Sequence, residues 1–365
     1  MTGLYIHIPF CASRCIYCDF YSTTQPQLQD RYVKALCREI DLITERPTIG
    51  TIYLGGGTPS QLTKKNLTRL LDYIYKVYDV DAAAEVTIEC NPDDIREGMF
   101  RGLPVNRVSM GAQSFSNERL KFLRRRHTAQ EVDDAVNILR KDGIHNISID
   151  LIYGFPEETI AEWEDDIAHV LKLKPEHISA YGLMYEEGTP LFRLLEQGKV
   201  KEVDEELSLT MYDRLIEKLV EAGYEHYEIS NFAKNGFRSK HNSSYWHNIP
   251  YIGLGASAHS YDLKTRQWNV DNINRYMASI EKGELPREIE QIDDDTRFND
   301  IVSTALRTKE GININDVPVA YQSTLLKDAQ PYINKGLLLH EGHRLHLSRA
   351  GINISNTIMS DLMRV

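Results

Sequence analysis

The sequence predicts an α/β fold, a partial (β/α)6 barrel followed by a C-terminal α+β module that resembles a winged helix. Two observations predict the barrel. Short strand-like runs alternate with amphipathic helical stretches, which is typical of parallel strands joined by helices. Polar or glycine residues then stand at the end of almost every run, where a barrel carries its site. A doubly wound sheet shares the alternation but gathers its site at one switch point.

Six runs are expected to form the strands of the barrel. They cover residues 4–9, 51–57, 85–90, 106–113, 146–154 and 177–184. Helices are expected between them, among others at 28–44, 63–77 and 128–143. In the last of these, Thr128 is the predicted N-cap, Glu131 completes a capping box and Gly143 ends the helix.

The second half of the chain predicts a different arrangement. Residues 204–224 indicate an amphipathic helix that ends near Gly223, and residues 226–233 indicate one further strand. From about residue 290 the pattern is a helix with a glycine turn, then a hairpin and a helix. We therefore expect three parts: the partial barrel at 1–225, a strand extension with a further motif segment at 226–285, and the winged-helix-like module at 286–365.

Composition excludes several function classes. The 365 residues are 42% apolar and 26% charged, as in ordinary globular proteins, and the net charge is −11. This charge argues against a protein dominated by phosphate contacts, although a local basic patch remains open. The C-terminal module is expected to be a packing appendage, with nucleic-acid binding as the alternative. No apolar run approaches the roughly 18–20 residues of a membrane span. No leader precedes the expected first strand, and a cytoplasmic location is expected.

Three cysteines stand within eight residues in the stretch CASRCIYC. Structural zinc normally takes four ligands, and no second CxxC pair exists among the five cysteines of the chain. A disulfide framework needs an even set and an oxidising compartment. An iron–sulfur cluster held by three thiolates leaves one iron free for another ligand. The spacing of Cys11, Cys15 and Cys18 favours this third interpretation.

Glycine and polar residues mark the ends of the later strands. The run Gly55–Pro59 is neither a P-loop nor a dinucleotide fingerprint, and its glycines would let a ligand approach the backbone closely. Four polar residues stand at or just beyond other strand ends: Glu89, Gln113, Arg125 and Asp150. Carboxylates suit hydroxyl groups, and an arginine suits a carboxylate through forked hydrogen bonds.

Together, the segments IHIPFCASRCIYCDF, YLGGGTPS, GAQSFSNERLKFLRRRHT and IDLIYGFPEET resemble one branch of the radical S-adenosylmethionine (SAM) superfamily. This branch contains oxygen-independent coproporphyrinogen III dehydrogenases and haem chaperones. The resemblance implies a [4Fe–4S] cluster on Cys11, Cys15 and Cys18, with SAM on the open iron. It also implies a SAM site lined by Tyr5, Tyr17, Gly56, Gly57, Thr58, Glu89, Gln113, Arg125, Asp150 and Met184.

Two differences between this chain and the dehydrogenases favour the haem chaperones. The dehydrogenases carry a further cysteine two residues after the third, where this chain has Phe20, and they carry an N-terminal extension where this chain has three residues before Leu4. The segment KHNSSYWHN also matches the H-N-x-x-Y-W pattern of the haem chaperones. That pattern implies a haem site formed by His241, Asn242, Tyr245 and Trp246, because histidine binds haem iron and aromatic rings cover a porphyrin. The axial ligand stays open, with His247 and His259 as alternatives.

The resemblance therefore implies a haem chaperone. Such a protein binds haem, carries a [4Fe–4S] cluster and SAM, and delivers haem to an acceptor protein, for example a membrane respiratory enzyme. The alternative is an oxygen-independent coproporphyrinogen III dehydrogenase, a radical SAM oxidoreductase that would use every SAM-site residue named above. The sequence leaves open whether the chain carries out radical chemistry.

Overall fold

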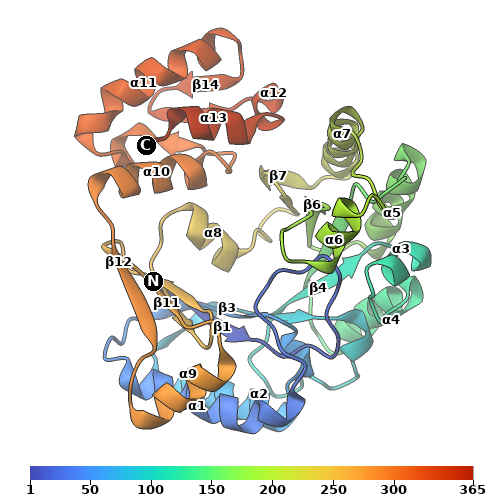
Figure 1. Cartoon of the computed structure of the whole chain (residues 1–365), viewed down its shortest axis with the longest axis vertical. Helices are drawn as coiled ribbons and strands as arrows, with labels where there is room; N and C mark the ends of the chain where they lie inside the picture. The colour runs from blue at the N-terminus through green and yellow to red at the C-terminus, as the bar shows by residue number, and fades with distance from the viewer. Residues whose placement is uncertain (365) are drawn as a thin grey trace.

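Six parallel strands in chain order form the centre of the molecule. The computed structural model describes residues 1–364, and Figure 1 shows these strands with helices packed around their outer side. The strands are β1 (Thr2–Ile8), β2 (Ile49–Gly56), β3 (Val80–Cys90), β4 (Arg107–Gln113), β5 (Asn146–Tyr153) and β6 (His177–Gly182). The predicted partial barrel is confirmed, and the main boundary difference is β3, which begins five residues before the predicted strand.

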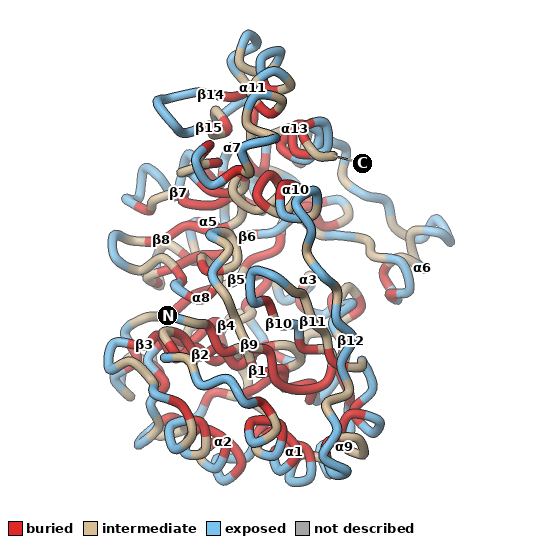
Figure 2. Tube along the Cα trace, turned by 90° about the vertical axis from the view of Figure 1, so that its left-hand side faces the viewer, coloured by how far each residue is buried: buried red, intermediate tan, exposed pale blue. Residues whose placement is uncertain are grey.

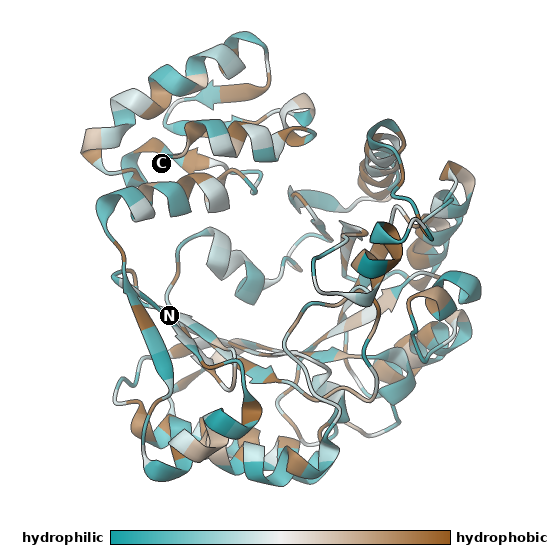
Figure 3. Ribbon diagram, viewed as in Figure 1, coloured by the Kyte–Doolittle hydropathy of each residue, from teal (hydrophilic) through white to brown (hydrophobic). Residues whose placement is uncertain are grey.

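The two faces of these strands have opposite character. On β1, Leu4, Ile6 and Ile8 are buried in the main hydrophobic cluster, and the same alternation continues on the next five strands. These apolar side chains pack against the outer helices, which include α1 (Gln29–Leu42), α2 (Lys64–Val77), α4 (Ala129–Lys141) and α5 (Ile160–Leu173). Figures 2 and 3 show the buried, apolar strands and the polar outer surfaces of the helices. The inward positions are mostly polar, aromatic or glycine, so the hydrophobic core surrounds the barrel interior.

Side-chain caps set the starts of α4 and α5. Thr128 accepts a hydrogen bond from the backbone of Glu131, whose carboxylate binds back to the N-cap, so the predicted capping box of α4 is confirmed. Gly143 has φ +86°, a conformation that favours glycine, and it follows the end of that helix. Thr159 forms the same box with Glu162 at the start of α5.

Further strands extend the sheet at both edges. Beside β1 lie β9 (Tyr251–Leu254), β10 (His259–Tyr261), β11 (Thr265–Asn269) and β12 (Arg287–Gln291), and only β9 runs parallel to its barrel neighbour. Beside β6 the chain forms a hairpin of β7 (Glu225–Glu228) and β8 (Asn231–Ala233). The single strand predicted over 226–233 is therefore wrong, because the Glu228 carboxylate accepts hydrogen bonds from Ser230 and Asn231 and holds the chain in a reversal.

The C-terminal residues form a smaller unit with its own core. It contains α10 (Asp294–Ala305), β13 (Ile312–Asn313), α11 (Val319–Asn334), β14 (Leu338–Glu341), β15 (Arg344–Leu347), α12 (Arg349–Ile352) and α13 (Ser355–Leu362). The three strands form a separate sheet in the order β13-β15-β14. Phe298, Val302, Leu325 and Ile358 are fully buried in its core. Helices followed by a hairpin are the arrangement that the sequence predicted.

Helix α7 (Glu205–Glu221) packs on α5, α9 (Ile273–Lys282) packs on α1, and α8 (Lys240–Trp246) contacts both β2 and α10. Figure 1 shows α8 on the concave side of the sheet, opposite α1 and α2. The Arg307 guanidinium lies 4.9 Å from the centre of the Trp246 ring of α8 and pairs with Glu228 at 2.9 Å. These contacts fix the C-terminal unit against the barrel. Among residues 1–364, none of the helices is both long and apolar enough to cross a bilayer.

Candidate functional site

A cavity of about 510 Å³ brings most of the predicted site residues together. It opens at the carboxyl ends of the barrel strands, where parallel strands carry their site. Its lining includes the predicted residues Cys11, Cys15, Tyr17, Cys18, Gly56, Gly57, Thr58, Glu89, Gln113, Arg125, Asp150, Met184 and Asn242. Tyr5, His241, Tyr245 and Trp246 do not line it. Segments separated by more than 200 residues thus meet in one space.

The cysteine loop is anchored to the barrel by Ile16, which lies between Cys15 and Cys18 in the sequence. Ile16 is buried in a small apolar cluster, its backbone N–H donates to the Leu123 carbonyl at 3.3 Å, and its own carbonyl accepts from Leu191 at 2.9 Å. The Thr58 hydroxyl lies 3.5 Å from the sulfur of Cys11. Burial raises the pKa of the Cys11 thiol, and it raises the pKa of Cys18 to about 11.

The donor set in this loop fits a thiolate-bound cluster. Thiols are the ligands of iron–sulfur clusters, and all three face the cavity from one loop. The guanidinium of Arg125 lies 3.6 Å from the sulfur of Cys15 and supplies positive charge beside it. Within residues 1–364, no three His, Cys, Asp or Glu side chains are close enough to hold a single metal ion. This agrees with a cluster, because each of its thiolate ligands binds a different iron.

Close packing against β1 and the residues that follow it requires glycine at the end of β2. Gly56 has φ +111°, and a Cβ there would lie 2.5 Å from the His7 ring. A Cβ at Gly57 would lie 2.8 Å from the carbonyl carbon of Pro9. His7 itself is held by the Tyr21 carbonyl at 2.9 Å and by the Tyr5 hydroxyl at 3.1 Å. Only glycine fits at these two positions, and Tyr5 lies behind the wall, where it contacts His7.

Two carboxylates face the cavity from neighbouring parts of the barrel. Glu89 accepts hydrogen bonds from the Tyr53 hydroxyl at 2.8 Å and from the backbone N–H of Gly56 at 3.0 Å. Burial raises the pKa of Glu89 to about 7, although both hydrogen bonds oppose the shift. Burial also raises the pKa of Asp150, against hydrogen bonds from Ser109 and other serines. These groups can accept hydrogen bonds from hydroxyl or ammonium groups of a ligand.

Arg125 provides the matching positive charge. Its Nη2 donates to Asn91 Oδ1 at 2.7 Å and to the Gly111 carbonyl at 2.6 Å, which fixes the plane of the guanidinium. Its buried Nε has no hydrogen-bond partner among the described residues. A buried donor without a partner is costly, and a ligand carboxylate would satisfy it. The cavity therefore combines acceptors and a donor suited to a zwitterionic nucleoside such as SAM.

The predicted haem residues on α8 do not converge on one open site. His241 is 1% exposed, and its ring nitrogens are hydrogen-bonded to Thr51 Oγ1 at 2.8 Å and to the Tyr245 hydroxyl at 2.9 Å. Neither nitrogen is free to bind haem iron in this structure. Asn242 lines the cavity, whereas Trp246 packs under Arg307 of the C-terminal unit.

Comparison with known proteins identifies the family of this chain. Residues 5–170 match the model of the Radical SAM superfamily. Over 372 residues the chain is 34% identical to the heme chaperone HemW of Lactococcus lactis subsp. lactis (strain IL1403), covering 99% of this chain and 97% of the relative. The chain belongs to the HemW family of radical SAM proteins. Heme chaperone HemW of Bacillus subtilis (strain 168) is 35% identical, with 98% of each chain covered.

A solved structure outside the HemW relatives has the same fold. Coproporphyrinogen III oxidase (HemN) from Escherichia coli, a radical SAM enzyme, superposes with a TM-score of 0.85. The superposition covers 99% of this chain and 89% of the other, at 22% sequence identity. At this identity the likeness shows the fold alone, and it extends over the barrel and the C-terminal unit.

Sequence reasoning missed several residues that line the cavity. They include Tyr53, Ser109, Ser179 and Tyr181. On a strand, every second residue faces the same side. Each of these four residues stands an even number of positions from another inward-facing residue of its own strand, so this alternation could have revealed them. Two apolar residues at the cavity, Phe20 and Met184, are 68% and 62% exposed.

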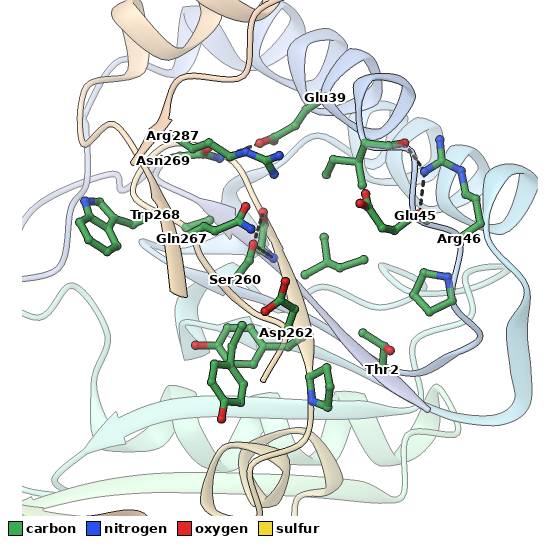
Figure 4. Close-up of a pocket in the computed structure, with 18 residues that line it drawn as sticks. Thr2, Glu39, Glu45, Arg46, Ser260, Asp262, Gln267, Trp268, Asn269 and Arg287 are labelled. Carbon is green, nitrogen blue, oxygen red and sulfur yellow. Dashed lines mark hydrogen bonds between the residues drawn. The ribbon is translucent and has the colours of Figure 1, made fainter. Parts of the chain in front are cut away.

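A second cavity, of about 330 Å³, contains none of the predicted residues. Figure 4 shows it between the end of α1 and the extension strands, with Glu39, Asn269 and Arg287 along one side. Glu39 accepts hydrogen bonds from Asn269 at 2.6 Å, from Tyr276 at 2.6 Å and from the backbone N–H of Gly255 at 2.8 Å. Because these partners satisfy its carboxylate, Glu39 joins α1 to the extension.

Proposed function

We propose that this chain is a haem chaperone that binds haem, carries a [4Fe–4S] cluster and SAM, and transfers haem to an acceptor protein. The observation that carries the proposal is the likeness to HemW proteins over nearly the whole of both chains. Phe20 supports the proposal further, because it stands where the dehydrogenases of this branch have a cysteine.

The cofactors are proposed to share the large cavity. Cys11, Cys15 and Cys18 would hold the cluster through thiolates, and SAM would bind beside it. Glu89 and Asp150 would accept hydrogen bonds from SAM, and the unpartnered Nε of Arg125 would donate one to its carboxylate. When bound and reduced, the cluster supplies one electron for cleavage of the sulfonium of SAM. The chain's own contribution is to bind and orient both groups.

The haem iron is proposed to bind an exposed histidine of the KHNSSYWHN segment, not the buried His241. His247 is exposed, and its Nδ1 lies 2.7 Å from the Ser243 carbonyl. A ring that donates one N–H to a carbonyl presents the other nitrogen in a fixed direction, as metal-binding histidines do. His259, exposed and stacked on Trp268, is the alternative ligand. Loss of the haem Soret band in His259→Ala but not in His247→Ala would reverse this choice.

The test is haem transfer by the intact chain. Protein reconstituted anaerobically with iron, sulfide and SAM is titrated with haem and then mixed with a haem-depleted acceptor membrane. We expect a Soret band on binding and its transfer to the membrane fraction. We further propose that haem release is coupled to the state of the cluster. Equal transfer rates with and without the cluster would reject this coupling. Formation of protoporphyrinogen IX from coproporphyrinogen III, with SAM and a reductant, would overturn the proposal in favour of the dehydrogenase.

The pH dependence of SAM binding gives a separate prediction. Because the pKa of Glu89 is raised to about 7, its ionised fraction falls as the pH is lowered from 8 to 6. If only the ionised form binds SAM, the apparent Kd rises about tenfold over this interval. Equilibrium dialysis of the reconstituted protein measures it. Glu89→Gln should bind SAM weakly at both values and lose the dependence, and a wild-type Kd that is constant from pH 6 to 8 would contradict the prediction.

A further inference from the structure

Helix α8 closes the barrel interior on the side away from the cysteine loop. The buried Glu85 carboxylate accepts hydrogen bonds from the backbone N–H groups of Lys240 and His241, each at 3.0 Å, and Ser239 caps the helix. The carboxylate thus satisfies two backbone donors that a helix start leaves free. Asn242, on the next position, reaches the large cavity. Helix α8 therefore borders the cavity, and Glu85 of β3 holds it in place.

The His241 ring lies against a residue of the cavity wall. It stacks on Tyr53 with ring centres 5.0 Å apart and planes 23° apart. Tyr5 adds a third ring, 6.2 Å from Tyr53 and 6.5 Å from His241. Thr51 and Tyr245 bind the two imidazole nitrogens, so the ring cannot rotate without losing a hydrogen bond. Burial lowers the pKa of His241 to about 3, so the ring is neutral and adds no charge to the barrel interior.

Tyr53 connects this ring stack to the proposed SAM contact. Its hydroxyl donates to Glu89 Oε1 at 2.8 Å, and the other carboxylate oxygen accepts from the Gly56 N–H. The two bonds fix the plane of the Glu89 carboxylate. An alanine at position 241 would leave an empty space beside Tyr53, and the ring could turn into it and release Glu89.

We propose that His241 is a positioning residue of the SAM cavity, holding Tyr53 in the orientation in which its hydroxyl binds Glu89, and that it is not a ligand of haem iron. This inference rests on the proposed role of Glu89 in binding SAM. It gives the H-N-x-x-Y-W segment a consistent set of contacts: His241 supports the cavity wall, Asn242 lines it, Tyr245 holds His241, and Trp246 joins the C-terminal unit.

The experiment compares SAM and haem binding in full-length, reconstituted variants. SAM binding is measured by dialysis and by the change in the electron paramagnetic resonance spectrum of the reduced cluster. We expect His241→Ala and Tyr53→Phe each to weaken SAM binding about tenfold, the effect of losing a hydrogen bond to a charged group. The double variant should bind SAM no more weakly than the weaker single variant, because both changes break one chain of contacts. The haem Soret band should be unchanged in all three.

His343→Ala is the control for SAM binding, since it removes an exposed histidine of the C-terminal unit and should leave the affinity for SAM unchanged. Unaltered SAM affinity in His241→Ala, or loss of its Soret band, would overturn the inference. Additive effects of the two changes would also overturn it. Tyr53→Phe keeps the ring stack and removes one hydroxyl, so it tests the Glu89 contact even if His241→Ala does not fold. Failure of the wild-type protein to bind SAM would instead refute the proposed function.

Discussion

Replacement of Cys15 by alanine is expected to abolish the brown iron–sulfur absorption of the reconstituted protein. Two thiols would remain in the loop, and a cluster with two exposed irons loses sulfide and iron readily. The loop itself should persist, because Ile16 and its backbone hydrogen bonds hold it to the barrel. Iron and sulfide analysis with optical spectroscopy measures the effect, and far-UV circular dichroism checks that the barrel is folded.

Cys37→Ala is the matched control. Cys37 is a half-buried cysteine of α1 that does not line the cavity, so its removal should leave iron, sulfide and absorption at wild-type values. A Cys15→Ala protein with full iron and sulfide content would contradict the assignment of the cluster to this loop.

Gly56→Ala is expected to have the largest effect on stability among the glycine positions of the cavity. The substitution forces a side chain into a backbone with φ +111° and sets its Cβ against the His7 ring. The left-handed backbone costs about 1–2 kcal/mol and the overpacking about 1–3 kcal/mol. We therefore expect the free energy of unfolding to fall by about 3 kcal/mol, and SAM binding to be lost with the displaced wall.

Gly143→Ala separates the two causes. Gly143 also has positive φ, +86°, but nothing lies within 4 Å of an added Cβ, so only the backbone cost of about 1–2 kcal/mol applies. Urea unfolding followed by circular dichroism compares the three proteins. Equal midpoints for the two variants would show that the contact with His7 costs nothing.

Local patterns explain what could be predicted of the fold. The strands of the barrel and the Thr128–Glu131 box depend on residues a few positions apart, so the sequence contains the whole signal. The extension strands do not depend on such local patterns. β9 pairs with β1 across about 250 residues, and β10 has only three residues. The turn between β7 and β8 depends on the Glu228 side chain binding its own following residues, which strand-like composition concealed.

The same distinction applies to the site. The cysteine spacing and the glycine run are local, and the structure brings both to one cavity. The position of His241 could not be predicted, because its burial depends on Thr51 and Tyr53, which are about 190 residues away in the chain. The H-N-x-x-Y-W match identified the segment, but the matched histidine is buried, and both of its ring nitrogens are hydrogen-bonded.

The separation of the two strand faces has a consequence for how this family can diversify. The aliphatic side chains that hold the fold, such as Ile6, Leu54 and Ile149, point outward to the helices, whereas the side chains that line the large cavity point inward. Most inward substitutions therefore remove little aliphatic packing, so selection can retarget the chemistry while the scaffold keeps its stability. The same fold can therefore support both enzymes and carriers, because substitutions on the inner wall change the specificity.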